Sequence, residues 1–330
     1  MKRALVTGGA GFIGSNLVKE LVAQGWQVDV VDDMSNGHLH LLEPLKTRVF
    51  LTGLVSIYES QYGRSKDDVY VFECDFAHSE VLQRIVDKKY DVVFHQAAVP
   101  RVSYSVEHPV ETTDVNLLRS VSLLHACVGN VEKVVVASSS SVYGGADVLP
   151  TSEAAPRNPK SPYALQKSVL EDYCRMFGNL YDLDTVCLRY FNVFGPGQYG
   201  DSPYSTAVSA WCDAIKNGKA LRSDGDGTQT RDMCYVDNVV SANILAALTK
   251  NRLMGKGYNV CCGDRTSNKE ILDYLIEKFP SAEVRHAPWR AGDVMHTQGD
   301  WSAANRDFGY VPLVKFWDGL RRTLEWWEID

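Results

Sequence analysis

The sequence predicts an α/β fold, in which a doubly wound parallel sheet is accompanied by a smaller α/β domain toward the carboxyl end. Two observations support this. Short β-branched apolar runs alternate with amphipathic helical patterns over the first half of the chain, which is typical of parallel sheets. A glycine-rich turn also joins the first strand to the first helix. We expect residues 1–188 plus 232–262 to form the larger domain, and residues 189–231 plus 263–330 the smaller one.

The first elements surround the glycine-rich turn. The pattern predicts a strand over Lys2–Thr7, a helix ending near Gln24 and a second strand over Gln27–Val31. The turn before the helix reads Gly8-Gly9-Ala10-Gly11-Phe12-Ile13-Gly14. A strand, this glycine spacing and a helix together predict a Rossmann-type dinucleotide site, because the amino terminus of a helix attracts a diphosphate.

Each glycine of the turn has its own expected role. Gly8 permits the tight turn, Gly11 lets the main chain approach a pyrophosphate, and Gly14 lets the helix pack closely on the sheet. Phe12 and Ile13 open the helix, so we place them in the cofactor site as well.

Asp32 follows the second strand and predicts which dinucleotide is bound. A carboxylate there accepts hydrogen bonds from both hydroxyls of the adenosine ribose, and it repels the 2′-phosphate of NADP. No arginine follows Asp32 closely in the sequence. The cofactor is therefore expected to be NAD.

Small or polar residues follow the later strands. Ligands of doubly wound sheets bind at the carboxyl ends of the strands, which makes Ala97 and Asp75-Phe76 candidate cofactor contacts, although Asp75 also suits an ordinary strand-end acid. Four serines, Ser138–Ser141, end another strand. The strands are expected over Tyr70–Phe72, Val92–His95, Val134–Ala137 and Thr185–Leu188, with helices over Ser79–Lys88 and Val110–Cys127 between them.

Tyr163 and Lys167 form a candidate catalytic pair. Ser161 and Pro162 predict the start of a helix, and residues four apart share one face of it. A free tyrosine has a pKa of about 10, but a nearby ammonium and the positive nicotinamide ring of oxidised NAD favour the phenolate. Tyr163 is thus a candidate base near neutral pH. The alternative is that this spacing marks a solvated helix face.

Charge and composition exclude several classes of function. The formal net charge of −7 argues against binding to nucleic acid or to an anionic membrane, and no apolar stretch is long enough to span a bilayer. The chain enters its first strand at once, so no secretory signal is expected. The eight cysteines include no Cys-x-x-Cys pair, which predicts reduced core thiols in a cytoplasmic protein. His38 and His40 lack a third ligand nearby, so no metal site is expected.

The motifs resemble those of the extended short-chain dehydrogenase/reductases. They are Gly-x-x-Gly-x-x-Gly, the serine-rich strand end with Tyr143-Gly144, and Ser-Pro-Tyr-x-x-x-Lys. The stretches Arg189–Gln198 and Gly225–Val240 are similar to the nucleotide-sugar epimerases of that family, and the resemblance covers nearly the whole chain. It implies that the larger domain binds NAD and the smaller one a UDP-sugar. It also implies a homodimer formed by helices Val110–Cys127 and Tyr163–Met176, whose apolar positions equally suit an intramolecular core.

The resemblance implies roles for individual residues. Ser139, four residues before Tyr143, would be the hydroxyl partner of Tyr163. Lys167 would bind a ribose of the cofactor and lower the pKa of Tyr163, and Asn116 would belong to the cofactor shell. The residues that would hold the nucleotide-sugar are Asn192, Arg231, Arg290 and Asp293. Two guanidinium groups suit a diphosphate, whereas either arginine alone, or the acid, also suits an ordinary surface position.

Ser140 and Ser141 favour epimerisation among the reactions of the resembled family. Its 4,6-dehydratases and glucuronate decarboxylases carry acidic residues there, and serines cannot do acid chemistry at neutral pH. A reductase would need NADPH, against Asp32. The remaining reaction is oxidation at carbon four, rotation of the 4-keto sugar and return of the hydride to its other face. We place both serines in the substrate site. A non-catalytic NAD-sensing protein is a rival interpretation, but such proteins usually lack Tyr163 or Lys167.

Thr297 bears on the substrate. Galactose-type epimerases of the resembled family carry a bulky tyrosine at this place, and a smaller residue leaves room for an N-acetyl group on carbon two. We therefore expect UDP-N-acetylglucosamine and UDP-N-acetylgalactosamine, with UDP-glucose and UDP-galactose as further candidates. Uronic acid epimerases share the sequence Ser-Ser-Ser-Ser-Val-Tyr-Gly, so a UDP-glucuronate-type substrate stays open. Arg101 suits such a carboxylate, and equally a solvated loop.

Overall fold

The structure, a computed structural model, describes residues 1–51, 53–65, 67–200, 206–288 and 294–329. Its contacts divide the chain into two compact units. The first unit consists of Met1–Ser138, Ser161–Leu188 and Val240–Tyr258, and the second of Ser139–Lys160, Arg189–Val239 and Asn259–Asp330.

These units differ from the expected domain bounds in the segment 139–160. The sequence prediction assigned this segment to the larger domain. Two of its main-chain hydrogen bonds are made within the second unit: Thr151 N–H donates to Gln298 O at 2.7 Å, and Asp300 N–H donates to Thr151 O at 2.9 Å. Residues 232–239 and 259–262 also group with the second unit.

The first unit is built on a sheet of eight strands in the described part of the chain, in the order β12-β7-β6-β5-β1-β2-β4-β3. The pairs along β6-β5-β1-β2-β4-β3 are parallel, and the chain order reverses at β1, between β5 and β2. The predicted doubly wound sheet is confirmed. The strands are β1 (Arg3–Thr7), β2 (Gln27–Asp32), β3 (Thr47–Phe50), β4 (Val69–Glu73), β5 (Val92–His95), β6 (Lys133–Ser139), β7 (Thr185–Tyr190) and β12 (Lys256–Val260).

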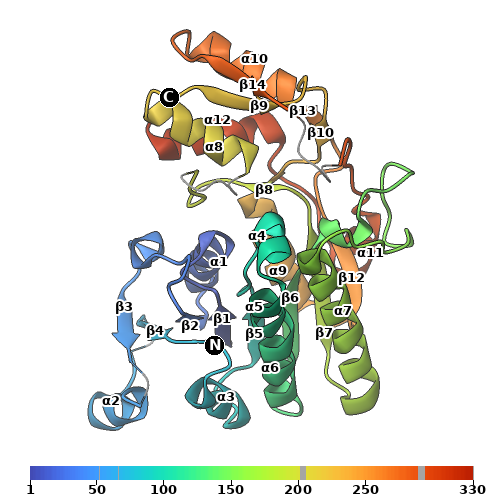
Figure 1. The fold of residues 1–330 in the computed structure, drawn as a ribbon. Coiled ribbons are helices and arrows are strands. Elements are labelled where there is room, and N and C mark those ends of the chain that lie inside the picture. Colours follow the sequence, from blue (N-terminus) through green and yellow to red (C-terminus); the bar gives the residue numbers. More distant parts are fainter. Residues whose placement is uncertain (52, 66, 201–205, 289–293, 330) are drawn as a thin grey trace. The chain divides into compact units, whose positions relative to one another are not determined.

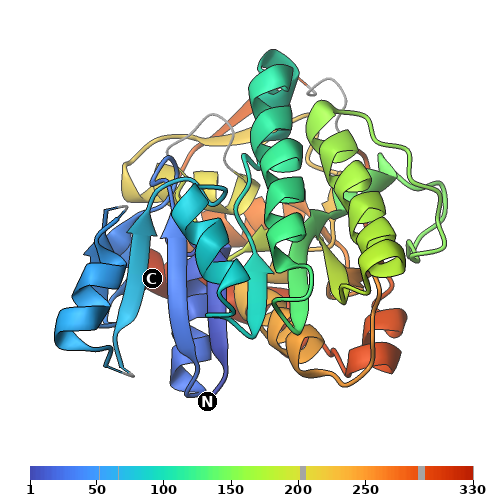
Figure 2. The ribbon, with the colours of Figure 1, turned by 90° about the horizontal axis from the view of Figure 1, so that it is seen from below.

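Helices cover this sheet. The predicted helix Val110–Cys127 is a continuous column of α5, a π-helical segment η2 and α6, and it lies beside α7 (Figures 1 and 2). The other expected helices are present with shifted ends. The helices are α1 (Phe12–Ala23), α2 (Val55–Tyr62), α3 (Ser79–Val86), α4 (Val102–Glu107), α5 (Pro109–Thr113), η2 (Asp114–Arg119), α6 (Ser120–Cys127), α7 (Pro162–Tyr181) and α9 (Val236–Leu248), with a short 3-10 turn η1 (Leu39–Leu42).

The second unit contains shorter strand pairs. In Figure 1, β9 and its parallel partner β14 lie between α10 and the helices α8 and α12. The ring of Phe194 packs against Tyr235 and Phe316, with ring centroids 5.6 and 5.3 Å away. The elements are η3 (Ser140–Tyr143), β8 (Val193–Phe194), α8 (Ala207–Lys216), β9 (Leu221–Asp224), β10 (Thr230–Arg231), β11 (Cys234–Tyr235), β13 (Thr266–Ser267), α10 (Asn268–Lys278), β14 (Val284–Ala287), α11 (Ser302–Phe308) and α12 (Phe316–Trp327).

All eight cysteines are free thiols, and all but Cys74 are buried. Within the described residues, the helices are too short or too polar to cross a membrane.

Candidate active site

The glycine turn lies at the point where the chain order of the sheet reverses. Gly8 has φ +67°, and its N–H donates to Val31 O at 2.8 Å. A Cβ at Gly8 would lie 2.8 Å from both N and Cα of Ala97, which follows β5. The turn after β1 and the loop after β5 are therefore in direct contact, and only glycine fits between them.

The amino terminus of α1 is open. Gly11 is its N-cap and supplies no side-chain cap, and the nearest atom to a Cβ placed there is Gly8 O at 3.3 Å. The main-chain N–H groups that begin the helix at Phe12 and Ile13 are thus suited to an anion. Gly14 packs on the turn itself, because a Cβ there would lie 2.0 Å from Gly8 O.

Asp32 is buried and oriented by main-chain groups. Its Oδ2 accepts from Ala10 N–H at 2.9 Å and its Oδ1 from Met34 N–H at 3.0 Å, while burial raises the pKa of the carboxyl. A Cβ at Gly37 would lie 2.5 Å from Oδ1, so this loop also depends on glycine. Each carboxylate oxygen keeps further lone pairs for a ribose diol. The turn, the helix terminus and this acid together fit NAD.

A buried hydrogen-bond chain supports the loop after β5. Ala97 N–H donates to Thr7 Oγ1 at 3.1 Å, and Thr7 Oγ1 lies 2.7 Å from His95 Nδ1. His95 Nε2 lies 2.8 Å from Ser120 Oγ, which donates to Asn116 O at 3.0 Å. Because Ser120 donates onward, it accepts from Nε2–H, and Thr7 donates to Nδ1. Burial lowers the pKa of His95 to about 3, so the ring is neutral.

Sequence reasoning missed Thr7, His95 and Ser120. The signal was present, since a polar residue that ends or interrupts an apolar run in a buried element requires a partner.

The side chain of Asn116 also holds the loop after β5. Its Oδ1 accepts from Val99 N–H at 2.7 Å, and its Nδ2 donates to Gln166 Oε1 at 2.9 Å.

Asp75 and Phe76 make protein contacts. Asp75 accepts from Ala77 N–H at 2.7 Å and pairs with Arg119 of η2. The buried ring of Phe76 lies 4.9 Å from the His95 ring. Contact of this segment with adenine stays a prediction.

Tyr163 and Lys167 lie on a buried face of α7, not on a solvated one. Ser161 Oγ caps the helix by accepting from Ala164 N–H at 3.2 Å, and Tyr163 N–H donates to Ser105 Oγ at 3.0 Å. Lys167 Nζ donates to the carbonyl oxygen of Ala137 at 2.8 Å and lies 5.9 Å from the centre of the Tyr163 ring. Tyr163 is 8% exposed and Lys167 2%. Burial lowers the pKa of Lys167 to about 8.

The serine run divides between two elements. Ser138 and Ser139 end β6, and Ser140 and Ser141 begin η3. Ser139 Oγ accepts from Ser141 N–H at 3.2 Å, which leaves its own O–H able to donate elsewhere. The Oγ of Ser141 is buried without a hydrogen-bond partner among the described residues. An orphaned hydroxyl of this kind indicates a ligand or water.

Tyr143, by contrast, supports the second unit. Its hydroxyl accepts from Arg189 Nη1 at 2.7 Å and donates to Asn259 Oδ1 at 2.7 Å. The following Gly144 has φ +63°, and a Cβ there would lie 1.9 Å from Asn158 O. The Tyr-Gly part of the motif therefore fixes the turn after the serines.

Three of the expected substrate residues are close together in the second unit. Asn192 Nδ2 donates to Thr297 Oγ1 and to Asp232 O, both at 3.2 Å, and Asp232 N–H donates to Thr297 Oγ1 at 3.1 Å. Arg231, in β10, donates from Nη1 to Met295 O at 3.2 Å. Arg290 and Asp293 lie outside the described residues.

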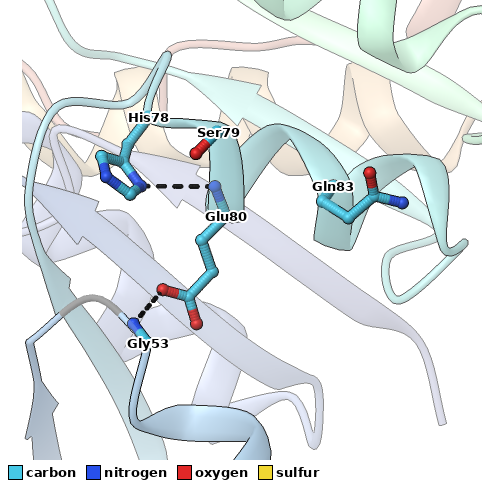
Figure 3. A pocket seen from close by; sticks show the side chains of 5 residues that line it. All are labelled: Gly53, His78, Ser79, Glu80 and Gln83. Atoms are coloured by element: carbon cyan, nitrogen blue, oxygen red, sulfur yellow. Dashed lines mark hydrogen bonds between the residues drawn. The ribbon is translucent and has the colours of Figure 1, made fainter.

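A surface hollow of about 560 Å³ lies elsewhere on the first unit, at the start of α3 (Figure 3). Glu80 N–H donates to His78 Nδ1 at 3.3 Å, and Glu80 Oε2 accepts from Gly53 N–H at 2.5 Å. None of the predicted site residues lines this hollow, so it is not the candidate active site. Its lining residues are Gly53, His78, Ser79, Glu80 and Gln83.

Comparison with known proteins agrees with this geometry. Residues 4–261 match the model of the NAD dependent epimerase/dehydratase family. The chain is 34% identical to the UDP-glucose 4-epimerase of Mycolicibacterium smegmatis, over 98% of this chain and 97% of that protein.

Two solved structures are similar over 99% of this chain, each at 32% identity. One is the UDP-N-acetylglucosamine 4-epimerase of Methanobrevibacter ruminantium in complex with UDP-N-acetylmuramic acid, with a TM-score of 0.87 over 98% of its chain. The other is the UDP-glucose 4-epimerase of Thermus thermophilus in complex with NAD, with a TM-score of 0.83 over 99%. The family model covers well over half of the chain, and these relatives match nearly its whole length, so the chain belongs to the NAD-dependent epimerase/dehydratase family.

Proposed function

We propose that the protein is an NAD-dependent UDP-sugar 4-epimerase. The observation that carries this proposal is the burial of Tyr163 and Lys167 on one face of α7, with the ammonium 5.9 Å from the phenol ring. That ammonium favours the phenolate, so Tyr163 removes the proton from the hydroxyl on carbon four of the sugar. Bound NAD supplies a hydride acceptor that returns the hydride later in the same cycle.

Ser139 completes the proposed catalytic set. Its Oγ accepts from Ser141 N–H, and its own proton remains available to an outside acceptor. In the proposal this acceptor is the oxygen on carbon four, and Ser139 relays its proton to and from Tyr163.

The serines at positions 140 and 141 support epimerisation over dehydration. Ser141 Oγ is buried and unpartnered among the described residues, so a sugar hydroxyl would satisfy it. Neither serine can eliminate water as an acid or base at neutral pH.

For the substrate we propose a UDP-N-acetylhexosamine. Thr297 contacts Asn192, the expected sugar-nucleotide ligand, through its hydroxyl, and it is a smaller side chain than the tyrosine of the galactose-type enzymes. The uronate alternative has weaker support, because Arg101 Nη2 donates to Asn36 Oδ1, in the loop that follows Asp32.

Tyr163→Phe tests the proposed reaction. The purified protein is incubated without added cofactor with UDP-N-acetylglucosamine, UDP-glucose and UDP-glucuronate, and the 4-epimers are quantified by chromatography. We expect turnover of the N-acetylated sugar, and a loss of about a hundredfold or more in the variant, since a positioned base contributes about that much. Full turnover by Tyr163→Phe would refute the assigned base.

Thr297→Tyr tests the proposed substrate. A tyrosine would fill the space beside Asn192, so turnover of UDP-N-acetylglucosamine should fall at least about tenfold relative to UDP-glucose, as expected for a steric loss of about 1.4 kcal/mol or more. Thr297→Ser keeps the hydroxyl and the small volume and serves as the control. An unchanged ratio of the two activities in Thr297→Tyr would contradict the argument.

We also propose a cytoplasmic homodimer. The helices expected to meet in it expose large apolar side chains, with Val110 83%, Leu118 59% and Leu165 53% exposed, and eight free thiols suit a reducing compartment. Light scattering should give a mass of twice that of the chain, and the mass of a single chain would contradict the dimer.

A further inference from the structure

A third buried polar residue follows the candidate catalytic pair along α7. Tyr163, Lys167 and Glu171 are spaced by four residues, so they line one face of the helix. Glu171 is 1% exposed. A carboxylate is almost never buried this fully without a partner, and neither the cofactor nor the substrate assignment uses it.

The end of β6 holds both charged groups. Ser138 Oγ donates to Glu171 Oε1 at 2.6 Å, a short distance typical of a hydrogen bond to an ionised acceptor. The preceding residue, Ala137, accepts from Lys167 Nζ through its carbonyl oxygen at 2.8 Å. Two consecutive residues of one strand therefore fix the lysine and the glutamate of one helix.

Lys167 and Glu171 are groups of opposite charge type, and both are buried away from solvent. Burial lowers the pKa of Lys167 to about 8, against the opposing effects of Cys187, Cys174 and the Glu171 carboxylate. The other titratable groups that face this lysine are His95 of β5, which is neutral, and the buried thiols of Cys174 and Cys187. A buried ammonium without a counter-charge tends to lose its proton. Among these groups, Glu171 is the carboxylate that can act as that counter-charge.

We propose that Glu171, oriented by Ser138, is a positioning residue for the catalytic pair: its negative charge keeps Lys167 an ammonium, and the ammonium keeps Tyr163 able to act as a base. The inference rests on the proposed function, because it assigns Glu171 a part in the chemistry of Tyr163. It also gives Ser138, the first serine of the run, a role.

Glu171→Gln tests the charge, because the amide oxygen still accepts from Ser138. The near-ultraviolet absorbance of the NAD-bound protein is measured as a function of pH. The same titration of a protein that also carries Tyr163→Phe is subtracted, so that the difference reports the phenolate of Tyr163. Without the carboxylate, Lys167 loses its proton at lower pH, so the phenolate of Tyr163 should form at higher pH. kcat for the UDP-sugar at about pH 8 should fall roughly tenfold, the effect of about one pKa unit, with KM unchanged.

Two further variants make the test decisive. Asp172→Asn removes the same charge from the next residue of α7, whose exposed side chain pairs with Arg175 at 3.4 Å, and it should behave as the wild type. Ser138→Ala keeps the Glu171 carboxylate but removes the hydroxyl that donates to it. This variant should also move the phenolate titration to higher pH, but by less than Glu171→Gln does. It also replaces Glu171→Gln in the test if that variant does not fold.

The outcomes separate the two proposals. If Tyr163→Phe is inactive while Glu171→Gln and Ser138→Ala titrate and turn over like the wild type, the role of Glu171 is refuted and the proposed function stands. A lower kcat at every pH with an unmoved phenolate titration also refutes it, because that result reflects packing alone. If Tyr163→Phe is fully active, the proposed function itself fails.

Discussion

We propose that Asp32 selects the cofactor through its carboxylate, whose orientation is set by main-chain groups. Two main-chain N–H groups hold its oxygens, at 2.9 and 3.0 Å, so little side-chain entropy remains to be lost when a ribose binds. In this proposal the same carboxylate opposes a 2′-phosphate, so one residue both binds NAD and rejects NADP.

Asp32→Asn should weaken NAD binding by about tenfold to a hundredfold, because hydrogen bonds to a charged group contribute about 1.5–3 kcal/mol, and it should reduce the preference over NADP. Titration calorimetry on cofactor-free protein measures both affinities. Asp33→Asn is the matched control, since that exposed carboxylate accepts from Ser35 and should leave binding unchanged. Equal effects of the two variants would contradict the assignment.

At the scale of elements, the contact between the glycine turn and α1 is the tightest constraint in the cofactor site. A Cβ at Gly14 would lie 2.0 Å from a main-chain oxygen, and main chain in a turn this short cannot move aside without also moving Ala97. The spacing of the three glycines is thus a requirement of packing as much as of phosphate binding.

Gly14→Ala should therefore lower the free energy of unfolding by about 2 kcal/mol or more and abolish tight NAD binding. Gly178→Ala makes the same change within α7, where the nearest atom is a methionine methyl at 3.4 Å. It should be neutral or stabilising by up to about 1 kcal/mol, because alanine favours a helix. Thermal unfolding with and without NAD compares the two variants, and a tolerated Gly14→Ala would refute the packing argument.

Two neighbouring regions show which helices and strands can be predicted from local sequence signals and which cannot. The first strand, helix and second strand end within about two residues of the sequence prediction, because glycine and alternation are local signals. The strand β3 and helix α2 were not predicted. Part of their stability comes from distant partners: Glu59 of α2 pairs with Arg84 at 3.2 Å, and Arg64 pairs with the buried Asp29 at 2.6 Å. Such pairs leave no periodic pattern in the sequence.

At the scale of the whole molecule, Asp232 joins three distant segments of the second unit. Its carboxylate accepts from the N–H groups of Cys262, Gly263 and Gly299 at 2.8–3.0 Å. Burial raises its pKa to about 6, against the opposing effect of these hydrogen bonds. Between about pH 4 and pH 6 the folded carboxyl keeps a proton that the unfolded one releases, so its contribution to stability falls as the pH rises through this window.

Asp232→Asn should remove this pH dependence. We compare the free energy of unfolding of the wild type with that of the variant. Their difference should decline by roughly 3 kcal/mol between pH 4 and pH 6, as expected for a pKa shift of about two units, and it should stay level above pH 6. Denaturant titrations at several pH values measure the difference. A difference that grows with pH would contradict the assignment, because it would mean that the ionised form is stabilised in the fold.

The sequence by itself determined the parallel sheet, the glycine turn and the candidate roles of Asp32, Tyr163 and Lys167, because each depends on residues within one element or one turn. Only the tertiary structure decided that Tyr143 supports the second unit, that His95 holds the loop of Ala97, and that Ser138 binds Glu171 on the same helix face as Lys167. The partners in these contacts are separated by between 33 and 116 positions in the sequence. Hydrogen bonds and buried charges are satisfied in space, so their partners are fixed by the packing of the sheet and its helices and not by the order of residues in the chain.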